Sequence, residues 1–320
     1  MEDVFVSIYM FGEIRNMFYL QNEDAIQYQT TNTAIALGKF DGIHLGHQMI
    51  IENLLNEKKK GRTTLVFTFK SSPNMILTGG SQKVIYTSEE KAYYFSELGV
   101  DVLLEYPFTK EFASISPEEF AYNCLAKQLG VRSIYVGEDF HFGKGRSGNV
   151  PVLKELGERY YFEVHALSKK TMHGKVISST TVRDMLENKF QVANEMLGNP
   201  YFVYGPVVHG MHMGGTIGFP TINQDIPGGK LIPASGVYAS AVTIDGQKYR
   251  AISNLGIKPT VTDSHHVGLE THILDYSGDL YGKNLKTELM FFIRPEERFN
   301  NIEQLQKQIN DDIHMMLENI

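Results

Sequence analysis

The chain has 320 residues, of which 42% are hydrophobic and 21% charged, and its formal net charge is −7. This length is typical of two domains, and the charge argues against a protein that holds nucleic acid by general electrostatics. No run approaches the roughly 20 apolar residues that span a bilayer, and we expect no signal peptide. The single cysteine, Cys124, excludes an internal disulfide. We therefore expect a cytoplasmic protein without nucleic-acid or membrane partners, in which Cys124 is a packing residue.

The first half of the chain alternates apolar runs with amphipathic segments. The last two helices predicted there begin at Thr87 and Ser116, each with a Glu three residues on, which is a capping-box pattern. Such alternation predicts a parallel sheet with helices on its faces, whose ligands bind at the carboxyl ends of the strands. The predicted strands are 31–37, 63–69, 100–106, 133–137 and 161–167, and the predicted helices are 48–59, 87–99 and 116–130, the last two ending at Gly99 and Gly130.

The pattern changes near residues 186–206. Beyond this point, short alternating runs separated by turns predict a compact antiparallel β-barrel, and residues 301–319 predict a closing helix. The predicted barrel runs are 236–244, 249–257, 269–276 and 286–293. We therefore expect an α/β chain with a Rossmann-like parallel-sheet domain over 1–186 and a barrel domain over 187–320.

The stretch GKFDGIHLGH, residues 38–47, lies between a predicted strand and a predicted helix. His44 and His47 could hold zinc, but no nearby Cys or His supplies the remaining ligands. An anion site fits better, because a helix N-terminus offers unpaired N–H groups and Gly42 and Gly46 let the backbone approach a ligand. The alternative is that His44 is a surface residue and His47 a helix cap. The turn between glycines favours a phosphate site.

Six motifs in order carry a family resemblance. GKFDGIHLGH resembles the nucleotidyltransferase signature of bacterial FAD synthetases, and the next two signatures resemble residues 136–148 and 177–186. Residues 218–223, 236–240 and 269–282 resemble the flavokinase domain that follows in such chains. The sequence is thus similar to the bifunctional riboflavin kinase and FMN adenylyltransferase family from about residue 34 onward.

For the first domain, the resemblance implies transfer of AMP from ATP to FMN, giving FAD and pyrophosphate. It implies catalytic roles for His44, His47 and Arg183. The segment 143–149 is expected to be a flap, for which a surface loop is the compatible alternative. The resemblance implies ATP or phosphate contacts at Gly38, Phe40, Asp41, Gly46, Ser178, Ser179 and Thr180, and flavin or nucleotide contacts at Asp139, Phe140 and, in the second domain, Asn254.

For the second domain, the resemblance implies phosphorylation of riboflavin by ATP. Glu270 would be the catalytic base, and Thr221 and Asn223 would bind Mg²⁺. Further ATP contacts are implied at Gly218, Pro220 and Thr221. Without the resemblance, Glu270 is more simply an outward residue of an alternating strand.

Several residues depart from the family pattern: Lys39, Ser72, His141, His209, His212, Gly215 and Val261. Gly215 stands where the family has an Arg next to the phosphates. This substitution suggests the hypothesis that adenylyl transfer is intact and kinase activity is weak or absent. A non-catalytic flavin-binding regulator and a nucleotidyltransferase for another phosphate acceptor are the other readings. The sequence does not indicate an oligomeric state.

Overall fold

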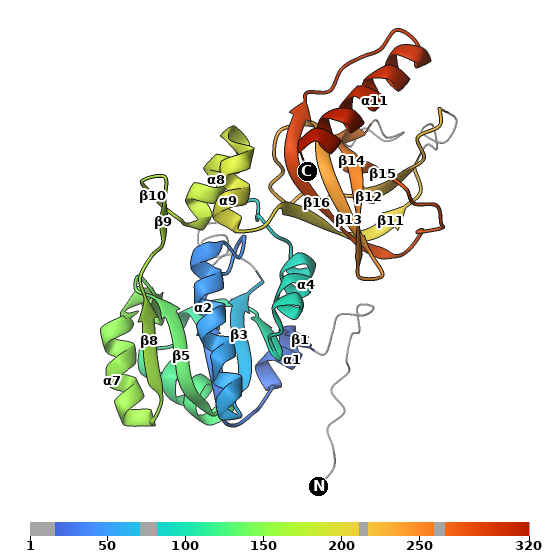
Figure 1. The fold of residues 1–320 in the computed structure, drawn as a ribbon. Helices are drawn as coiled ribbons and strands as arrows, with labels where there is room; N and C mark the ends of the chain where they lie inside the picture. Colours follow the sequence, from blue (N-terminus) through green and yellow to red (C-terminus); the bar gives the residue numbers. More distant parts are fainter. Residues whose placement is uncertain (1–16, 71–81, 211–216, 259–265, 320) are drawn as a thin grey trace. The chain divides into compact units, whose positions relative to one another are not determined.

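The computed structural model describes residues 17–70, 82–210, 217–258 and 266–319. The chain divides into two compact units, drawn as ribbons in Figure 1. The first unit comprises residues up to 82 together with 91–178, and the second comprises 83–90 together with 179–320. Within the described residues, no helix combines the length and the apolar character that crossing a membrane requires.

The first unit is built on a parallel sheet, as the sequence predicted. Among the described residues it has six strands in the order β1-β4-β3-β2-β5-β8, and every paired neighbour runs parallel. The edge strand β1 lies before residue 34, where the family resemblance begins. The bounds are β1 Phe18–Gln21, β2 Thr33–Leu37, β3 Thr63–Phe69, β4 Val102–Tyr106, β5 Val131–Gly137 and β8 Glu163–Leu167.

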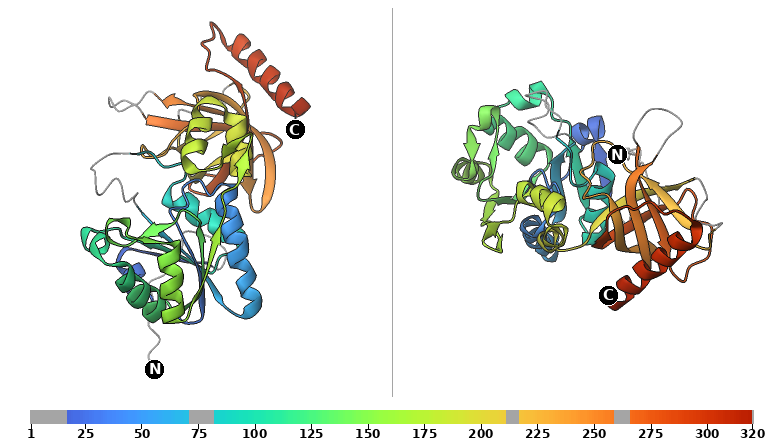
Figure 2. Two further views of the ribbon diagram at one scale, coloured as in Figure 1. Left: turned by 90° about the vertical axis from the view of Figure 1, so that its left-hand side faces the viewer. Right: turned by 90° about the horizontal axis from the view of Figure 1, so that it is seen from above.

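Helices cover both faces of this sheet, and Figure 2 shows α2 and α7 on opposite faces. Both predicted capping boxes are present, because Thr87 and Ser116 each exchange hydrogen bonds with the Glu three residues on. The helices are α1 Asn22–Gln27, α2 Leu45–Leu55 with a 3₁₀ turn Asn56–Lys60, α4 Ser88–Leu98, α5 Lys110–Ser114, α6 Pro117–Glu119 with a π-helical continuation Phe120–Gln128, and α7 Val150–Tyr160.

Strand β2 lies at the point where the strand order reverses. The chain adds β3 and β4 on one side of β2, and later adds β5 and β8 on the other side. A crevice opens outside the carboxyl ends of the strands at such a switch point, and ligands of open α/β sheets bind there. The turns that follow β2 and β5 therefore lie where the fold itself predicts a ligand.

The second unit contains the predicted antiparallel barrel. In the described part of the chain it is closed by six strands in the order β11-β12-β15-β14-β13-β16. Four of them match the predicted runs, and the closing helix α11, Ile302–Asn319, is confirmed. The strands are β11 Tyr201–Val208, β12 Thr221–Asp225, β13 Gly236–Ile244, β14 Gln247–Lys258, β15 His266–Ile273 and β16 Asn284–Arg294, and two helices precede them, α8 Ser179–Asn188 and α9 Phe190–Leu197.

A chain of buried hydroxyl groups crosses the interior of the barrel. The Ser240 hydroxyl donates to the Ala251 carbonyl oxygen at 3.0 Å and lies 2.7 Å from the Ser253 hydroxyl. The Ser253 hydroxyl in turn lies 2.8 Å from that of Thr271. Each of these polar side chains has a hydrogen-bonding partner, which is what burial of a hydroxyl requires.

A buried ion pair joins the segment 83–90 to the barrel within the second unit. The Lys230 ammonium group contacts the Glu90 carboxylate, and both side chains are almost fully buried. Lys230 also donates to the carbonyl oxygen of Phe202 at 3.1 Å and lies 4.4 Å from the centre of the Tyr201 ring. Burial raises the pKa of the Glu90 carboxyl, and the Lys230 charge opposes that rise.

Replacing Lys230 with methionine is expected to lower the free energy of unfolding of the barrel by about 3–5 kcal/mol, because Glu90 is left buried without its cation. Urea unfolding followed by far-UV circular dichroism measures the loss, and hydrogen exchange of the β11 amides assigns it to the barrel. Lys283→Met is the control, because Lys283 is 49% exposed and lies 4.0 Å from its exposed partner Asp245. Equal stability of the two variants would contradict the prediction.

Candidate active sites

The turn after β2 holds its shape through an unusual backbone. Phe40, Gly42 and Ile43 have φ angles of 47°, 85° and 40°, in the left-handed region that L-residues with a side chain rarely adopt. Phe40 and Ile43 are fully buried, so packing maintains the strain. The Thr68 hydroxyl also donates to the Lys39 carbonyl oxygen at 3.0 Å, which ties the turn to β3.

His44 and His47 are stacked at the start of α2. Their ring centres are 3.7 Å apart with 17° between the planes. His44 is the N-cap, and its Nδ1 accepts a hydrogen bond from the His47 backbone N–H at 3.4 Å. Because Nδ1 accepts, the proton of a neutral His44 ring is on Nε2. A Cβ on Gly46 would lie 3.2 Å from the His44 ring, so glycine makes room for the stack.

This arrangement corrects the alternative reading of the two histidines. His44 is 5% exposed and is therefore not a surface residue, and it is His44 rather than His47 that caps the helix. The helix begins at Leu45, three residues before the predicted start, because His44 supplies this cap. The Nδ1 atom of His47 is buried and has no hydrogen-bond partner among the described residues.

Desolvation makes both imidazoles neutral at pH 7. It lowers the pKa of His44 to about 4. Desolvation also lowers the pKa of His47 well below its usual range, and the neighbouring His44 lowers it further. In the free protein, each ring therefore offers one N–H donor rather than a positive charge. In the described part of the chain, no cluster of three or more His, Cys, Asp or Glu side chains could hold a metal ion.

The third nucleotidyltransferase motif begins beside this turn. The Ile177 carbonyl oxygen lies 3.9 Å from the position that a Cβ on Gly46 would occupy. The chain continues through Ser178 into α8, which begins at Ser179, so the hydroxyl residues of this motif lie at a helix N-terminus. Thr180 is exposed, and Arg183 follows one turn later, partly buried.

The second motif follows β5, the neighbour of β2 in the sheet. Asp139 is exposed and pairs with Lys169 at 2.8 Å, and Phe140 stacks on Phe142. Burial raises the pKa of Asp139, but its hydrogen bond and charge contact with Lys169 bring the pKa below its usual value. The segment 143–149 forms the 3₁₀ turn Lys144–Arg146 inside a hairpin of β6, His141–Phe142, and β7, Gly148–Asn149.

The sequence did not single out Lys169. It lies two residues beyond the predicted strand 161–167, at the same carboxyl edge of the sheet as Asp139, and this position was the available signal.

On the barrel, three of the predicted residues form one row across neighbouring strands. Glu270 on β15 lies opposite Asn223 on β12 and opposite Asn254 on β14. Residues directly opposite each other share a face of the sheet, and their neighbours along the strand face the other way. Since Thr271 points into the barrel, the row of Asn223, Glu270 and Asn254 is on its outer face.

A cavity of about 480 Å³ is lined in part by residues of β12 and β15, the strands that carry Asn223 and Glu270, although neither of these two residues lines it. Pro220 and Thr221, both predicted as ATP contacts, line it together with Thr271, Leu280 and Tyr281. The ring of His209, one of the residues that depart from the family pattern, stacks on Tyr281 with 4.0 Å between centres. Gly218 is exposed and has a φ of 85°, which favours glycine. Ser72, His212, Gly215 and Val261 lie outside the described residues.

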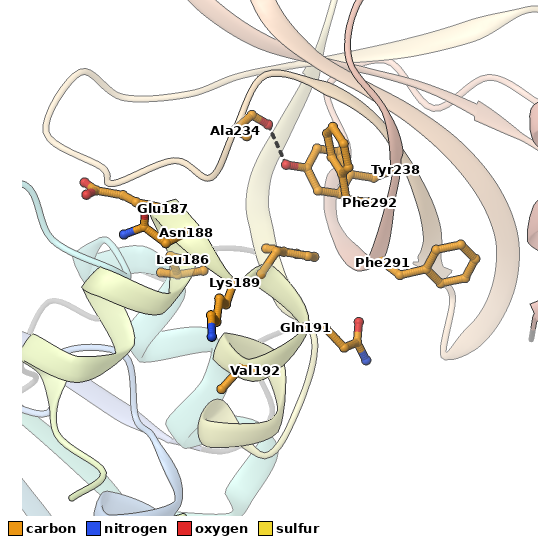
Figure 3. A pocket seen from close by; sticks show the side chains of 11 residues that line it. Leu186, Glu187, Asn188, Lys189, Gln191, Val192, Ala234, Tyr238, Phe291 and Phe292 are labelled. Atoms are coloured by element: carbon orange, nitrogen blue, oxygen red, sulfur yellow. Dashed lines mark hydrogen bonds between the residues drawn. The ribbon is translucent and has the colours of Figure 1, made fainter. Parts of the chain in front are cut away.

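Figure 3 shows a second cavity of the barrel unit, of about 450 Å³, between the α8–α9 junction and strands β13 and β16. Its walls are largely apolar, and the Tyr238 hydroxyl donates to the Ala234 carbonyl oxygen. None of the predicted site residues line this cavity. We therefore centre the second candidate site on the row and its neighbouring cavity. The lining includes Leu186, Phe190, Ala234, Tyr238, Phe291 and Phe292.

Comparisons with known proteins match the chain in two successive parts. A family model described as FAD synthetase matches residues 26–181, and one described as riboflavin kinase matches residues 197–320. Proteins named bifunctional riboflavin kinase/FMN adenylyltransferase are similar along most of the chain. The relative from Buchnera aphidicola is 36% identical over 89% of this chain and 93% of its own, and that from Escherichia coli K12 is 36% identical over 87% and 90%.

A relative of the same name from Bacillus subtilis is 34% identical over 90% of this chain and 92% of its own. Among solved structures, one titled as a macrolide-efflux protein from Streptococcus pneumoniae matches with a TM-score of 0.81 and 29% identity. That match covers 94% of this chain and 99% of the other. Its title names a different role, and we use the match as support for the fold.

Proposed function

This chain belongs to the bifunctional riboflavin kinase/FMN adenylyltransferase family, and we propose that the residues described above carry its two reactions. The chain phosphorylates riboflavin to FMN and then adenylylates FMN to FAD, using ATP in both steps. The observation that carries this conclusion is the ordered match of both family models. We assign adenylyl transfer to residues 1–186 and the kinase reaction to residues 187–320.

In adenylyl transfer, a phosphate oxygen of FMN attacks the α-phosphorus of ATP, and the bond to the leaving pyrophosphate breaks. The chemistry needs positioning and stabilisation of the charge on that leaving group. We assign these roles to His44 and His47, whose N–H groups lie at the start of α2. We also assign ATP contacts to Gly38, Phe40, Asp41 and Gly46, which lie between the end of β2 and the first turn of α2.

Two further sets of residues complete this proposal. Ser178, Ser179 and Thr180 offer hydroxyl groups and backbone N–H groups at the start of α8, and the Arg183 guanidinium suits phosphate oxygens. Asp139 and Phe140, at the carboxyl end of β5, are assigned to the flavin or the nucleotide. The Lys169 ammonium beside Asp139 adds a positive charge at that edge of the sheet.

In the kinase reaction, the terminal ribityl hydroxyl of riboflavin attacks the γ-phosphorus of ATP and ADP leaves. We assign Glu270 as the base that accepts the hydroxyl proton. Thr221 and Asn223 face the same side of β12 and offer a hydroxyl and an amide oxygen, which suit a hard cation such as Mg²⁺. Bound Mg²⁺ would neutralise phosphate charge, and we assign ATP contacts to Pro220, which lines the cavity, and to Gly218.

Anion binding at the first site is expected to take up protons. A phosphate group favours the charged imidazole, so bound pyrophosphate raises the pKa of His44 from its free value of about 4. Between the free and bound pKa values, affinity therefore rises as pH falls. Calorimetry in buffers of different ionisation enthalpy measures the uptake, and His44→Gln should abolish most of it. Equal uptake by both proteins would contradict this prediction.

A product assay tests the proposed function. The purified chain is given riboflavin or FMN separately with Mg-ATP, and FMN and FAD are quantified. We expect FMN from riboflavin and FAD from FMN. Robust FMN formation would reject the weak-kinase hypothesis that Gly215 suggested. If neither product formed, the flavin-binding regulator would be the better reading, and FAD formation alone would leave only the adenylyltransferase.

A further inference from the structure

Glu296 lies just beyond the end of β16 and reaches the row on β14. The Asn254 side-chain Nδ2 donates to Glu296 Oε1 at 2.9 Å. Gly256 lies two residues further along the same face of β14, and a Cβ at that position would collide with the Glu296 carboxylate. The absence of a side chain at Gly256 therefore allows the carboxylate to rest on the strand next to Asn254.

The backbone that carries Glu296 is fixed two residues earlier. Arg294 Nε donates to Oδ1 of Asp312 on α11, and Arg294 Nη2 donates to Oδ2 of the same residue, both at 2.9 Å. This pair is largely buried, with 15% of the Arg294 side chain and 2% of the Asp312 side chain exposed. A paired contact of this kind sets direction as well as distance. This pair therefore anchors to α11 the end of β16, from which the chain continues to Glu296.

The carboxylate of Glu296 decides which way the Asn254 amide points. An ionised carboxylate only accepts hydrogen bonds, so the amide atom that faces it must be the nitrogen. The other atom, Oδ1, is buried and has no hydrogen-bond donor among the described residues. A buried oxygen without a donor is costly, and this one belongs to the residue that is opposite Glu270 on the neighbouring strand. The geometry points to a donor that is supplied by a ligand.

We propose that Glu296 is a positioning residue of the kinase site, which holds the Asn254 amide so that Oδ1 accepts a hydroxyl group of the polyol chain of riboflavin. This inference rests on the proposed role of Glu270. Asn254 pairs with Glu270 on the neighbouring strand and is hydrogen-bonded to Glu296, and two carboxylate-bearing neighbours disfavour phosphate oxygens. A neutral polyhydroxyl chain, which donates hydrogen bonds, is the ligand class that fits.

The test compares Glu296→Gln with Glu297→Gln in the full chain. Glutamine keeps the size of Glu296 but can donate or accept, so the Asn254 amide is no longer held in one orientation. We expect Glu296→Gln to raise the riboflavin KM about tenfold, the value of roughly one hydrogen bond, with kcat and the KM for Mg-ATP nearly unchanged. Glu297 is the exposed neighbour, and its variant should behave as the natural protein does.

A double-mutant cycle with Asn254→Ala tests whether Glu296 acts through Asn254. If it does, adding Glu296→Gln to Asn254→Ala changes the riboflavin KM no further. Independent, multiplying effects would overturn the inference, as would a Glu296→Gln variant that matches Glu297→Gln. FAD formation from FMN checks folding of the same preparations. If the natural protein makes no FMN, the proposed kinase function fails, and quenching of riboflavin fluorescence still measures the predicted loss of binding in each variant.

Discussion

Substituting His47 with alanine is expected to lower kcat for FAD formation from FMN by about 10²–10³-fold, the usual cost of removing one donor to developing charge. The reason is geometric. His47 stacks on His44 and touches the edge of Phe40, so its ring is held at the start of α2 before any ligand arrives. Assays with FMN and Mg-ATP measure the loss, and FMN formation from riboflavin by the same preparation should be unchanged.

The matched control for this prediction is His314→Ala, which removes an exposed histidine from α11. An equal fall of both activities in His47→Ala would indicate a folding defect and would not support the assigned role. Full FAD formation by a well-folded His47→Ala protein would refute the phosphate grip. His44→Gln refines the test, because the glutamine amide can replace the Nε2–H donor of His44 but not the stacked ring.

Substituting Glu270 with glutamine is expected to lower kcat of the kinase reaction by about 10²–10⁴-fold, since a general base contributes that much to proton transfer. Glutamine cannot accept the proton of the ribityl hydroxyl, yet it preserves the shape of the row with Asn223 and Asn254. We expect the riboflavin KM to change little. Steady-state assays with riboflavin and Mg-ATP provide the measurement, and FAD formation from added FMN should be unaffected.

Asp225→Asn is the control for Glu270. Asp225 lies on β12 two residues beyond Asn223, so it shares the outer face and is exposed. If Glu270 were only an outward residue of an alternating strand, both variants would keep full kinase activity. That result would leave the family membership intact and would remove Glu270 from the mechanism.

Local features of the fold could be predicted from the sequence with good success. Thr87 and Ser116 start helices as predicted, because a capping box is encoded within four residues. Strands β11 and β12 were missed. The first is a nearly continuous apolar run interrupted by Gly205 and Pro206, and the second is short and mostly polar, so neither alternates clearly. Their place in the barrel depends on partners far away in the sequence.

In the candidate sites too, features that a short motif encodes could be predicted, and features that depend on residues distant in the sequence could not. The motif around His44 and His47 was recognisable because its spacing is local. The direction of the cap, the burial of His44 and its lowered pKa depend on packing, which a ten-residue motif does not contain. Lys169 and Glu296 were not predicted for a related reason. Each acts on a residue that is far away in the chain, and neither stands in a recognised motif.

The hydroxyl chain inside the barrel has a single direction. The Ser240 hydrogen is committed to a carbonyl oxygen, so the Ser253 hydroxyl must donate to Ser240, and the Thr271 hydroxyl must donate to Ser253. Thr271 lines the 480 Å³ cavity, and its hydrogen faces away from it. At this one point of the lining, the Thr271 hydroxyl can accept a hydrogen bond but has no hydrogen left to donate. A group that hydrogen-bonds to Thr271 from the cavity must therefore be a donor, such as an amino or hydroxyl group, whereas a carbonyl oxygen finds no partner in this hydroxyl.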